Sequence, residues 1–457
     1  MDPLSSASAT WQVFEQLSAA HIQSFKQAGI DTLQAQLLYN RGIKTSEEMR
    51  AFLDARYDRT PDPLNLIDMP RAIQRIQRAF EQREHITVYG DYDADGVTSA
   101  ALLTRGLRLL GQPAELLDYH IPNRLHDGRG LNIDTLNRLK QHGTSLLITT
   151  DCASSDVEQV AHANTSGMDV IITDHHHPPA VLPAAYALVN PWREDSQYGE
   201  RNLCGAGIAF KLVQALCHAY QRAGEEQSLL DLVAVGTIAD VAPLLGENHT
   251  LVRLGLQQLN QTQNPGLQAL IHATRLQTGR IRERDISYVL APRLNAAGRM
   301  EDASIAFELL TTDDLEQASQ LAEKLETLNL SRQQQTETLM RQVHQELQHH
   351  PDDQVLLVSG NEWPEGIIGL VAGRLVDEFH RPVFVLSQGP KESRGSARGP
   401  AGFNIILALR ACAHLFVRYG GHAQAAGFTI ANEHVEELHQ HLLKWDGNNA
   451  TSTLAPL

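Results

Sequence analysis

The sequence predicts an α/β protein built on a doubly wound parallel sheet, followed by a smaller α/β unit. Short runs rich in β-branched residues recur at 85–91, 145–151 and 169–177, and helical patterns such as 96–111 lie between them. Strands that alternate with helices at this spacing form parallel sheets. An aspartate stands at the end of each run, at Asp91, Asp151 and Asp174. Ligands of such sheets bind at the carboxyl ends of the strands.

Composition limits the classes of protein to consider. The 457 residues are 42% hydrophobic, which is enough to bury at least two cores. No apolar run approaches 18 residues and no signal-peptide pattern opens the chain, so we expect a soluble, cytoplasmic protein. The four cysteines form no CxxC pair, which favours a reducing compartment. A net charge of -16 disfavours a surface coated with DNA contacts but leaves room for a local basic groove.

The stretch "VYGDYDADGVTSAALL" (88–103) places Asp91, Asp93 and Asp95 on alternate positions directly after an apolar run. Three carboxylates so close together repel one another unless a cation neutralises them. A further acid, Asp240, lies in the apolar segment 229–244, where a charge needs a partner.

Four of the acids form an oxygen-rich set with one imidazole: Asp93, Asp95, Asp151, His175 and Asp240. Such a set suits Mn²⁺ or Mg²⁺ better than zinc. Four carboxylates can hold two ions ~4 Å apart, the separation used in phosphoryl transfer. One carboxylate must then bridge the ions, and Asp151, on the middle strand, is the natural bridge.

The second half of the chain predicts a change of domain. Residues 303–349 are helical and very polar, and we interpret them as one long exposed connecting helix, with an ordinary surface helix as the alternative. Two apolar runs at 354–360 and 381–389 then flank the helical pattern 365–379. We expect a catalytic domain at 1–302, a connecting helix at 303–349, a substrate-binding domain at 350–446 and a disordered tail at 447–457.

Eight motifs together carry a family resemblance. "GDYDADGVTS", "TTDCASS", "TDHHHPP" and "GTIADVAPL" resemble the four motifs of the DHH phosphoesterase superfamily. "YHIPNRLHDGRGL", "LAPRLNAAGRM", "RGSARG" and "RYGGHAQAAGF" are similar to the RecJ-like single-stranded-DNA exonucleases. The resemblance covers roughly residues 35–445. It implies a hydrolase that releases 5′-mononucleotides from the 5′ end of single-stranded DNA in repair and recombination, with two Mn²⁺ or Mg²⁺ ions.

The resemblance also implies a role for each matching residue. The metal ligands would be Asp93, Asp95, Asp151, His175 and Asp240. Asp91, Asp174 and His176 would lie in the immediate shell, and the catalytic set would be Asp91, Asp151, His175 and His176. Arg299, Ser396 and Arg398 would hold the terminal 5′ phosphate, with Gly421 and His422 nearby, since Arg offers bidentate donors to phosphate. Arg124 would reach the scissile phosphate or the one next to it.

The chain departs from the pattern at three positions. Tyr89 stands where many DHH enzymes have a histidine, and Ala153 stands where glycine is common. Arg129 replaces an aromatic residue, and its guanidinium plane could stack on a base.

We expect a monomer that binds 5′-phosphorylated single-stranded DNA, with a helicase or single-strand-binding protein as a possible partner and with no membrane. Many RecJ-like proteins continue into an OB-fold, and the sequence predicts none here. Two alternatives stay open: a DHH phosphodiesterase of short oligonucleotides or cyclic dinucleotides, and a catalytically inert replication scaffold.

Overall fold

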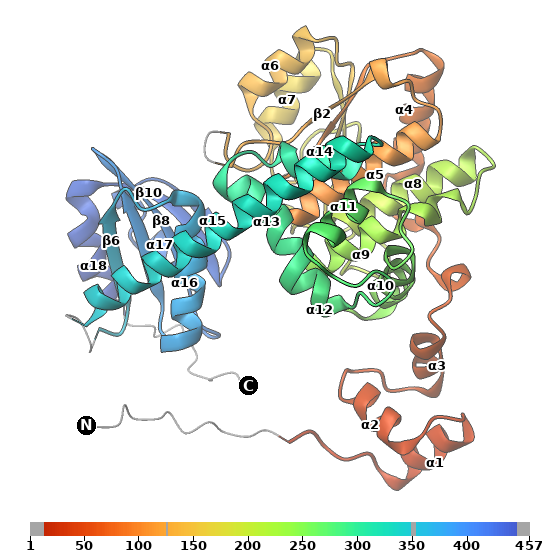
Figure 1. Cartoon of the computed structure of the whole chain (residues 1–457), viewed down its shortest axis with the longest axis horizontal. Coiled ribbons are helices and arrows are strands. Elements are labelled where there is room, and N and C mark those ends of the chain that lie inside the picture. The colour runs from red at the N-terminus through yellow and green to blue at the C-terminus, as the bar shows by residue number, and fades with distance from the viewer. Residues whose placement is uncertain (1–12, 125–126, 349–352, 446–457) are drawn as a thin grey trace. The chain divides into compact units, whose positions relative to one another are not determined.

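The computed structural model describes residues 13–124, 127–348 and 353–445, so the predicted tail at 447–457 lies outside the described residues. The chain separates into two compact units (Figure 1). The larger is Gln23–Asn329, and the smaller contains the chain from Leu330 onward together with the segment before Gln23.

The larger unit contains a five-stranded sheet in which every described pairing is parallel. Its strands are β1 (Ile86–Tyr89), β2 (Leu117–His120), β3 (Leu146–Thr150), β4 (Asp169–Thr173) and β5 (Ala187–Val189), in the spatial order β2-β1-β3-β4-β5. The three predicted runs form the three central strands. The sheet therefore places the ends of β1, β3 and β4 side by side.

Separate cores cover the two faces of this sheet. On one face, Ile86 and Ile148 join the core that contains α5 (Ala94–Leu109) and α8 (Gly205–Ala219). On the other face, Leu147 and Ile172 pack with α6 (Ile133–Gln141) and α7 (Val157–Thr165). Successive strand residues alternate between the two cores, as the period of a β-strand requires. The predicted doubly wound fold is confirmed.

Further helices complete the larger unit. They are α1 (Ala19–Gln27), which crosses the unit boundary, α2 (Thr32–Tyr39), α3 (Ser46–Asp54), α4 (Met69–Glu81), α9 (Leu230–Ala239), α10 (Gly246–Leu259), α11 (Pro265–Ala273), α12 (Glu283–Asp285), α13 (Ala291–Met300) and α14 (Ser304–Thr311). A π-helical turn at Ile286–Leu290 joins α12 to α13. No helix among the described residues is long and apolar enough to cross a membrane.

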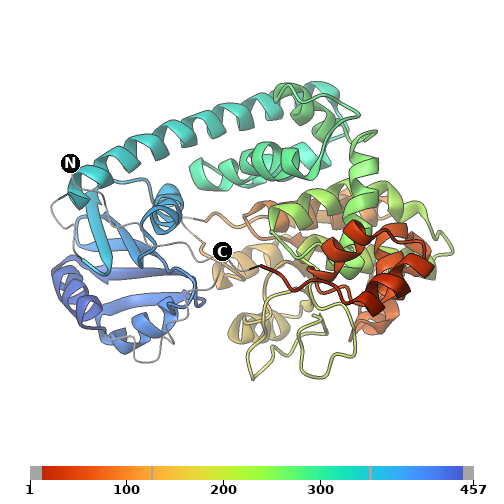
Figure 2. The ribbon, with the colours of Figure 1, turned by 90° about the horizontal axis from the view of Figure 1, so that it is seen from below.

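The polar stretch 303–349 contains two helices instead of the single one expected from its composition. Phe307 and Leu309 are buried because α14 packs against α5. The second helix, α15 (Leu315–Leu347), runs for 33 residues, as Figure 2 shows along its length, and the boundary between the units falls inside it. Some of its sparse apolar residues, among them Leu325, Leu339 and Val343, are buried, whereas Leu315 and Leu330 are exposed.

The smaller unit is a second α/β fold. Its strands are β6 (Leu356–Asn361), β7 (Val383–Gln388), β8 (Glu392–Arg398), β9 (Phe416–Gly421) and β10 (Ala425–Ala431), in the order β6-β7-β8-β10-β9. The β6–β7 pair is parallel and the other pairs are antiparallel. The helices are α16 (Glu365–Phe379), α17 (Ile405–Ala411) and α18 (Val435–Lys444).

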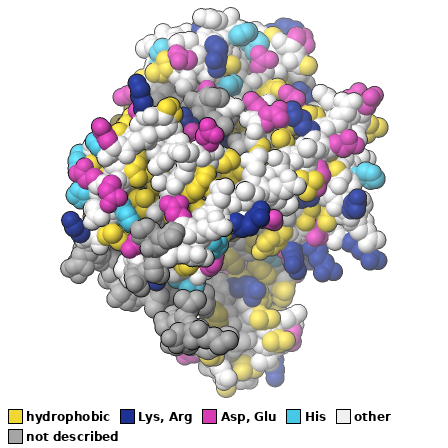
Figure 3. Space-filling model, turned by 60° about the vertical axis from the view of Figure 1, so that its left-hand side comes forward, with side chains coloured by type: hydrophobic (Ala, Val, Ile, Leu, Met, Phe, Trp, Pro, Cys, Tyr) yellow, Lys and Arg dark blue, Asp and Glu magenta, His cyan; other side chains and the backbone are white. Residues whose placement is uncertain are grey.

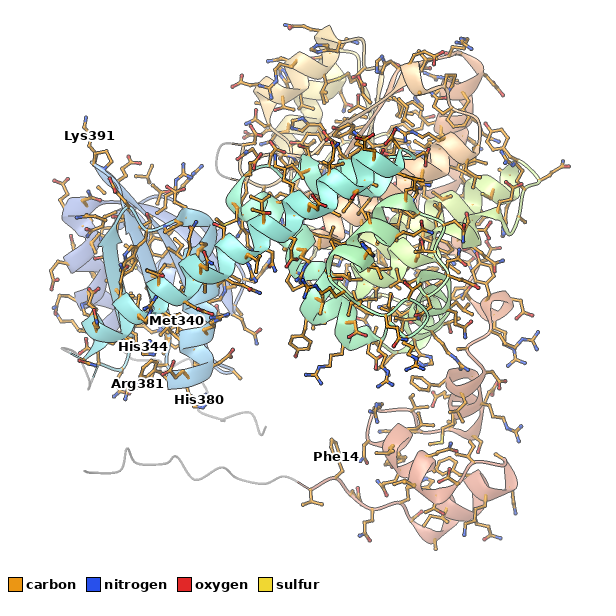
Figure 4. All side chains as sticks on the ribbon, viewed as in Figure 1. Phe14, Met340, His344, His380, Arg381 and Lys391 are labelled. Atoms are coloured by element: carbon orange, nitrogen blue, oxygen red, sulfur yellow. The ribbon has the colours of Figure 1, made fainter. Side chains whose placement is uncertain are left out.

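Two labelled side chains locate the parts of the smaller unit in Figure 4. Lys391 marks the turn between β7 and β8. His344, near the end of α15, lies 3.0 Å from a carboxylate oxygen of Glu378 on α16. On the face drawn in Figure 3, acidic and basic side chains are interspersed.

Candidate metal centre

The predicted strand-end acids lie together in the larger unit. Asp151 follows β3 directly and Asp174 follows β4, while Asp93 caps the N-terminus of α5 and Asp240 follows α9. Their donor atoms form three groups, each within 4.8 Å, that could hold a metal ion: Asp91–Asp93–Asp151, Asp151–His175–His176 and Asp95–His175–Asp240. Asp151 and His175 each belong to two groups, so the groups form one continuous centre.

Glycines allow the two helices to approach the strand ends this closely. A Cβ on Gly96 of α5 would lie 2.6 Å from the Cβ of Asp91, and one on Gly205 of α8 would lie 2.6 Å from the Cβ of Asp151. Any larger side chain would push these helices away from the acids. Asp151 itself has a left-handed backbone, with φ at 64°.

Asp95 uses the N-terminus of α8, which sequence reasoning missed. Its two carboxylate oxygens accept hydrogen bonds from the backbone N–H groups of Gly205 (2.7 Å) and Ala206 (3.0 Å). Free N–H groups and the helix dipole stabilise a carboxylate at this position. The glycines at the start of the apolar segment 204–217 were the only sequence signal for this contact.

Crowding makes the acids hard to ionise without a cation. Burial and the neighbouring Asp93 raise the pKa of Asp91 to about 6. Burial and Asp95 raise the pKa of Asp240 to about 7, and the same two causes raise that of Asp151 well above its ordinary value. These directions are those expected of like charges in a desolvated site.

His175 lies among these carboxylates. Its Nε2 is 2.9 Å from Oδ1 of Asp151, and its Nδ1 is 3.9 Å from Oδ2 of Asp240. Burial opposes protonation, but Asp151 and the other acids outweigh it and raise the pKa of His175 to about 10. Apart from this imidazole, no described group donates to the buried Oδ1 atom of Asp151. Crowded carboxylate oxygens with one imidazole fit a hard divalent cation.

Asp174 organises the residues around the centre. Its carboxylate accepts hydrogen bonds from the backbone N–H groups of Ser154 (3.0 Å) and His175 (2.7 Å), and it lies 2.7 Å from Nδ1 of His176. These bonds outweigh burial and lower the pKa of Asp174. Asn190, which sequence reasoning missed, donates to the backbone carbonyl of His176.

A cavity of about 290 Å³ opens beside the carboxylates. Three aspartates and three arginines line it, together with other residues: Tyr92, Asp93, Ala94, Asp95, Arg124, Arg129, Ala239, Asp240, Asn295 and Arg299. The guanidinium of Arg124 lies over the ring of Tyr92, 4.9 Å from its centroid. Arginine next to a metal-binding set is a typical environment for a phosphate.

Two departures from the family pattern have defined positions. Tyr89 is fully buried in the core beneath α6 and α7, and its hydroxyl donates to the carbonyl of Gly130. It belongs to none of the three groups of possible metal ligands. Arg129 bonds to Asp91 and lies 2.6 Å from a ring nitrogen of His176.

The predicted phosphate residues divide between the units. Arg299 belongs to the larger unit, whereas Ser396 and Arg398 lie on β8 of the smaller one. Nη1 of Arg398 donates to the hydroxyl of Ser396 at 3.2 Å. A Cβ on Gly369 of α16 would lie 3.0 Å from that hydroxyl, so this glycine keeps the space open.

The predicted glycine, Gly421, ends β9, and the predicted histidine, His422, begins the turn to β10. Gly421 has φ at +148°, and a Cβ there would lie 2.3 Å from the carbonyl oxygen of Ala425. The N–H of His422 donates to the same carbonyl. Because Ala425 pairs with Arg398, this turn lies next to the end of β8.

Comparison with protein families gives two matches. Residues 85–237 match the model of the DHH family, N-terminal domain, and residues 352–446 match the DHHA1 domain. The first match contains all the predicted centre except Asp240.

Related proteins match over nearly the whole chain. The single-stranded-DNA-specific exonuclease RecJ of Bacillus subtilis is 38% identical over 93% of this chain, which spans 54% of that relative's length. The RecJ of Salmonella typhimurium is 34% identical, with 90% of this chain and 74% of the relative covered. A crystal structure of Thermus thermophilus RecJ in complex with Mn²⁺ is 31% identical and has a TM-score of 0.82, covering 95% of this chain and 62% of that one. The chain therefore belongs to the RecJ family of DHH proteins.

Proposed function

We propose that the chain is a metal-dependent hydrolase that degrades single-stranded DNA from its 5′ end to 5′-mononucleotides. The observation that carries the proposal is the continuous centre in which Asp151 joins two groups of possible metal ligands, beside a cavity that three arginines line. Relatives that are named single-stranded-DNA-specific exonucleases support the choice of substrate. DNA repair and recombination, in the cytoplasm, is the setting that we propose.

Two Mn²⁺ or Mg²⁺ ions are the proposed cofactors, in keeping with the Mn²⁺ complex of the Thermus thermophilus relative. Asp93, Asp95, Asp151, His175 and Asp240 would hold them. When bound, such ions lower the pKa of water and stabilise the leaving oxygen of a phosphodiester. Asp95 enters this set already fixed by two backbone donors of α8, which orient its carboxylate.

The remaining proposed residues bind the DNA strand. Arg124 lines the cavity and would reach the phosphate of the bond that breaks or the one next to it, and Arg299, which lines the same cavity, would bind the terminal 5′ phosphate. Ser396 and Arg398, with Gly421 at the end of β9 and His422 in the adjacent turn, would bind the terminal 5′ phosphate and so set the direction of digestion. Two further predictions remain: that the protein is a monomer, and that it works with a helicase or a single-strand-binding protein.

The test compares four substrates: a single strand labelled on its 5′ phosphate, the corresponding duplex, a short oligonucleotide and a cyclic dinucleotide. Each is incubated with Mn²⁺ and, separately, with excess EDTA. We expect labelled mononucleotide as the first product from the single strand, in Mn²⁺ only.

Asp151→Asn serves as the inactive control for contaminating nucleases. Preferred cleavage of the short substrates would overturn the exonuclease proposal in favour of a phosphodiesterase. No cleavage of any substrate, by a protein that is folded and binds Mn²⁺, would favour the inert scaffold.

A further inference from the structure

The loop that carries Arg129 is built to hold one side chain in place. Gly128 and Gly130, on either side of Arg129, have φ at +81° and +80°, a conformation that glycine adopts most readily. A Cβ on Gly130 would lie 2.4 Å from Oδ2 of Asp156, the atom that accepts a hydrogen bond from the N–H of Leu131. The Gly130 carbonyl accepts the hydroxyl of buried Tyr89. These contacts hold the backbone on the C-terminal side of Arg129.

The guanidinium of Arg129 joins two residues of the centre. Its Nε donates to Oδ2 of Asp91 at 3.0 Å, and its Nη2 lies 2.6 Å from Nε2 of His176. Asp91 is only 1% exposed, whereas the Arg129 side chain is 44% exposed and lines the cavity. One edge of the guanidinium is therefore held against the buried acid while the rest of the group borders the open space.

Two contacts of His176 decide which of its ring nitrogens donates a hydrogen bond and which accepts one. Its Nδ1 lies 2.7 Å from a carboxylate oxygen of Asp174, so Nδ1 carries the hydrogen and donates it. Its Nε2 then accepts from Arg129, which can only donate. Both ring nitrogens are occupied in this arrangement. His176 and Asp174 together orient the guanidinium.

Arg129 has donors left for a ligand. A guanidinium carries five N–H groups, and the bonds to Asp91 and His176 use two of them. Asp93, Asp95 and Asp240 line the same cavity as acceptors, so an anion there needs added positive charge. A planar fork of donors at a fixed place suits the oxygens of a phosphate.

We propose that Arg129 binds a non-bridging oxygen of the phosphodiester that is cleaved and stabilises the charge that develops on it. His176 and Asp174 are the residues that position it. The inference rests on the proposed function and deepens it, because it assigns to this chain an arginine that touches the reacting phosphate. A fixed donor aimed at such an oxygen contributes about 10²–10³-fold to the rate.

The experiment measures three quantities on Arg129→Gln and Arg129→Lys: steady-state kinetics on 5′-phosphorylated single strands, strand binding in Ca²⁺, and Mn²⁺ affinity without DNA. For Arg129→Gln we expect kcat to fall about 10²-fold or more, strand binding to weaken, and Mn²⁺ affinity to stay equal or increase, since a cation beside Asp91 has been removed. Arg129→Lys should recover part of kcat. Arg138→Gln, on α6 outside the cavity, is the matched control and should behave as wild type.

The positioning role has its own test. His176→Ala should reproduce much of the kcat loss, and the loss in the double variant with Arg129→Gln should be smaller than the product of the two single losses. His176→Gln, whose amide oxygen still accepts a hydrogen bond, should retain more activity than His176→Ala. Strictly multiplicative losses would overturn the coupling.

The outcomes separate this inference from the proposed function. If wild type digests single strands and Arg129→Gln matches it in kcat and strand binding, only the assignment of Arg129 fails. If Arg129→Gln weakens Mn²⁺ binding and excess metal restores full kcat, Arg129 merely supports the metal ligands and the inference also fails. If wild type cleaves no strand, the proposed function fails, and unchanged strand binding by Arg129→Gln in Ca²⁺ would overturn the inference as well.

Discussion

The acidic centre of the larger unit and one face of β8 in the smaller unit, the face that carries Arg394, Ser396 and Arg398, differ in how deeply their charged side chains are buried. Asp91 and Asp151 are almost fully buried, and their pKa values are raised. Arg398 on β8 is half-buried and bonds to a neighbouring hydroxyl. The first region is held together by the fold against repulsion that a cation would relieve. In the second region the charged group stays partly exposed to water, so its desolvation costs little free energy.

The largest effect should come from Asp151, which belongs to two of the three groups of possible ligands in the centre. Asp151→Asn removes a charge from the shared position, and we expect activity to fall about 10³-fold or more, because several kcal/mol of charge stabilisation depend on the ions. Calorimetry should show weaker Mn²⁺ binding, while the metal-free variant unfolds at the same or a higher temperature, since repulsion is reduced. Activity above a tenth of wild type with unchanged Mn²⁺ affinity would contradict the two-ion centre.

A smaller and more selective effect is expected on β8. Arg398→Ala should raise KM for 5′-phosphorylated strands about 10- to 100-fold, as expected for the loss of a charge-assisted hydrogen bond of about 1.5–3 kcal/mol. A strand with a 5′ hydroxyl should be affected far less. Arg394 lies on the same face of β8 but pairs with Glu365 at 2.6 Å, so Arg394→Ala is the control. Equal losses on both strands would show that Arg398 does not recognise the terminal phosphate.

Packing under the same face can be tested with two glycines on paired strands. A Cβ on Gly395 of β8 would lie 2.1 Å from the ring of Phe428, whereas a Cβ on Gly427 of β10 would come no closer than 3.9 Å to another atom. Gly395→Ala should therefore lower the free energy of unfolding by about 1–3 kcal/mol, because it overpacks the sheet. Gly427→Ala should change it little. Denaturant titration of the two variants measures both free energies of unfolding. Equal values would contradict the register of β8 and β10, in which Gly395 lies opposite Phe428.

The weakest effect should be the change with pH in the melting temperature of the protein without bound metal. The pKa values of Asp91 and Asp240, about 6 and about 7, are raised above the ordinary value of about 3.9. The stabilisation from protonating them is complete below pH ~4 and is lost as pH rises through 6 and 7. The melting temperature of the metal-free protein should therefore fall, by an amount on the order of a few degrees, between pH 5 and pH 8.

Mn²⁺ should raise the melting temperature more at pH 8 than at pH 5, because ionised carboxylates bind the cation. Asp240→Asn should flatten the pH dependence of the metal-free protein and is the control. A metal-free melting temperature that rises over this range, with no change in Asp240→Asn, would show that the centre is not under electrostatic strain.

Sequence patterns predicted the central strands because β1, β3 and β4 are buried on both faces and therefore read as continuous apolar runs. The edge strand β2 was missed because "LDYH" is short and half-exposed, and β5 because it has only three residues. The two-helix structure of 303–349 was missed because the apolar residues of α14 were averaged into a polar stretch.

For the centre, parallel topology was enough to bring Asp91, Asp151 and Asp174 to one edge of the sheet. The contact of Arg129 with His176, 47 positions away, could not be predicted, because it depends on the backbone angles of the flanking glycines. The backbone donors that Asp95 receives from α8 carry no side-chain signature either.

The acids of the centre are far apart along the chain, from Asp91 to Asp240, and come from β1, β3, β4, α5 and α9. Each contact over such a sequence separation closes a long loop of unfolded chain, which costs conformational entropy. During synthesis, a chain that stops short of Asp240 contains an incomplete set of ligands and binds the ions poorly. The proposed activity would thus depend on synthesis of the chain through Asp240, because no shorter product contains the complete set of acids.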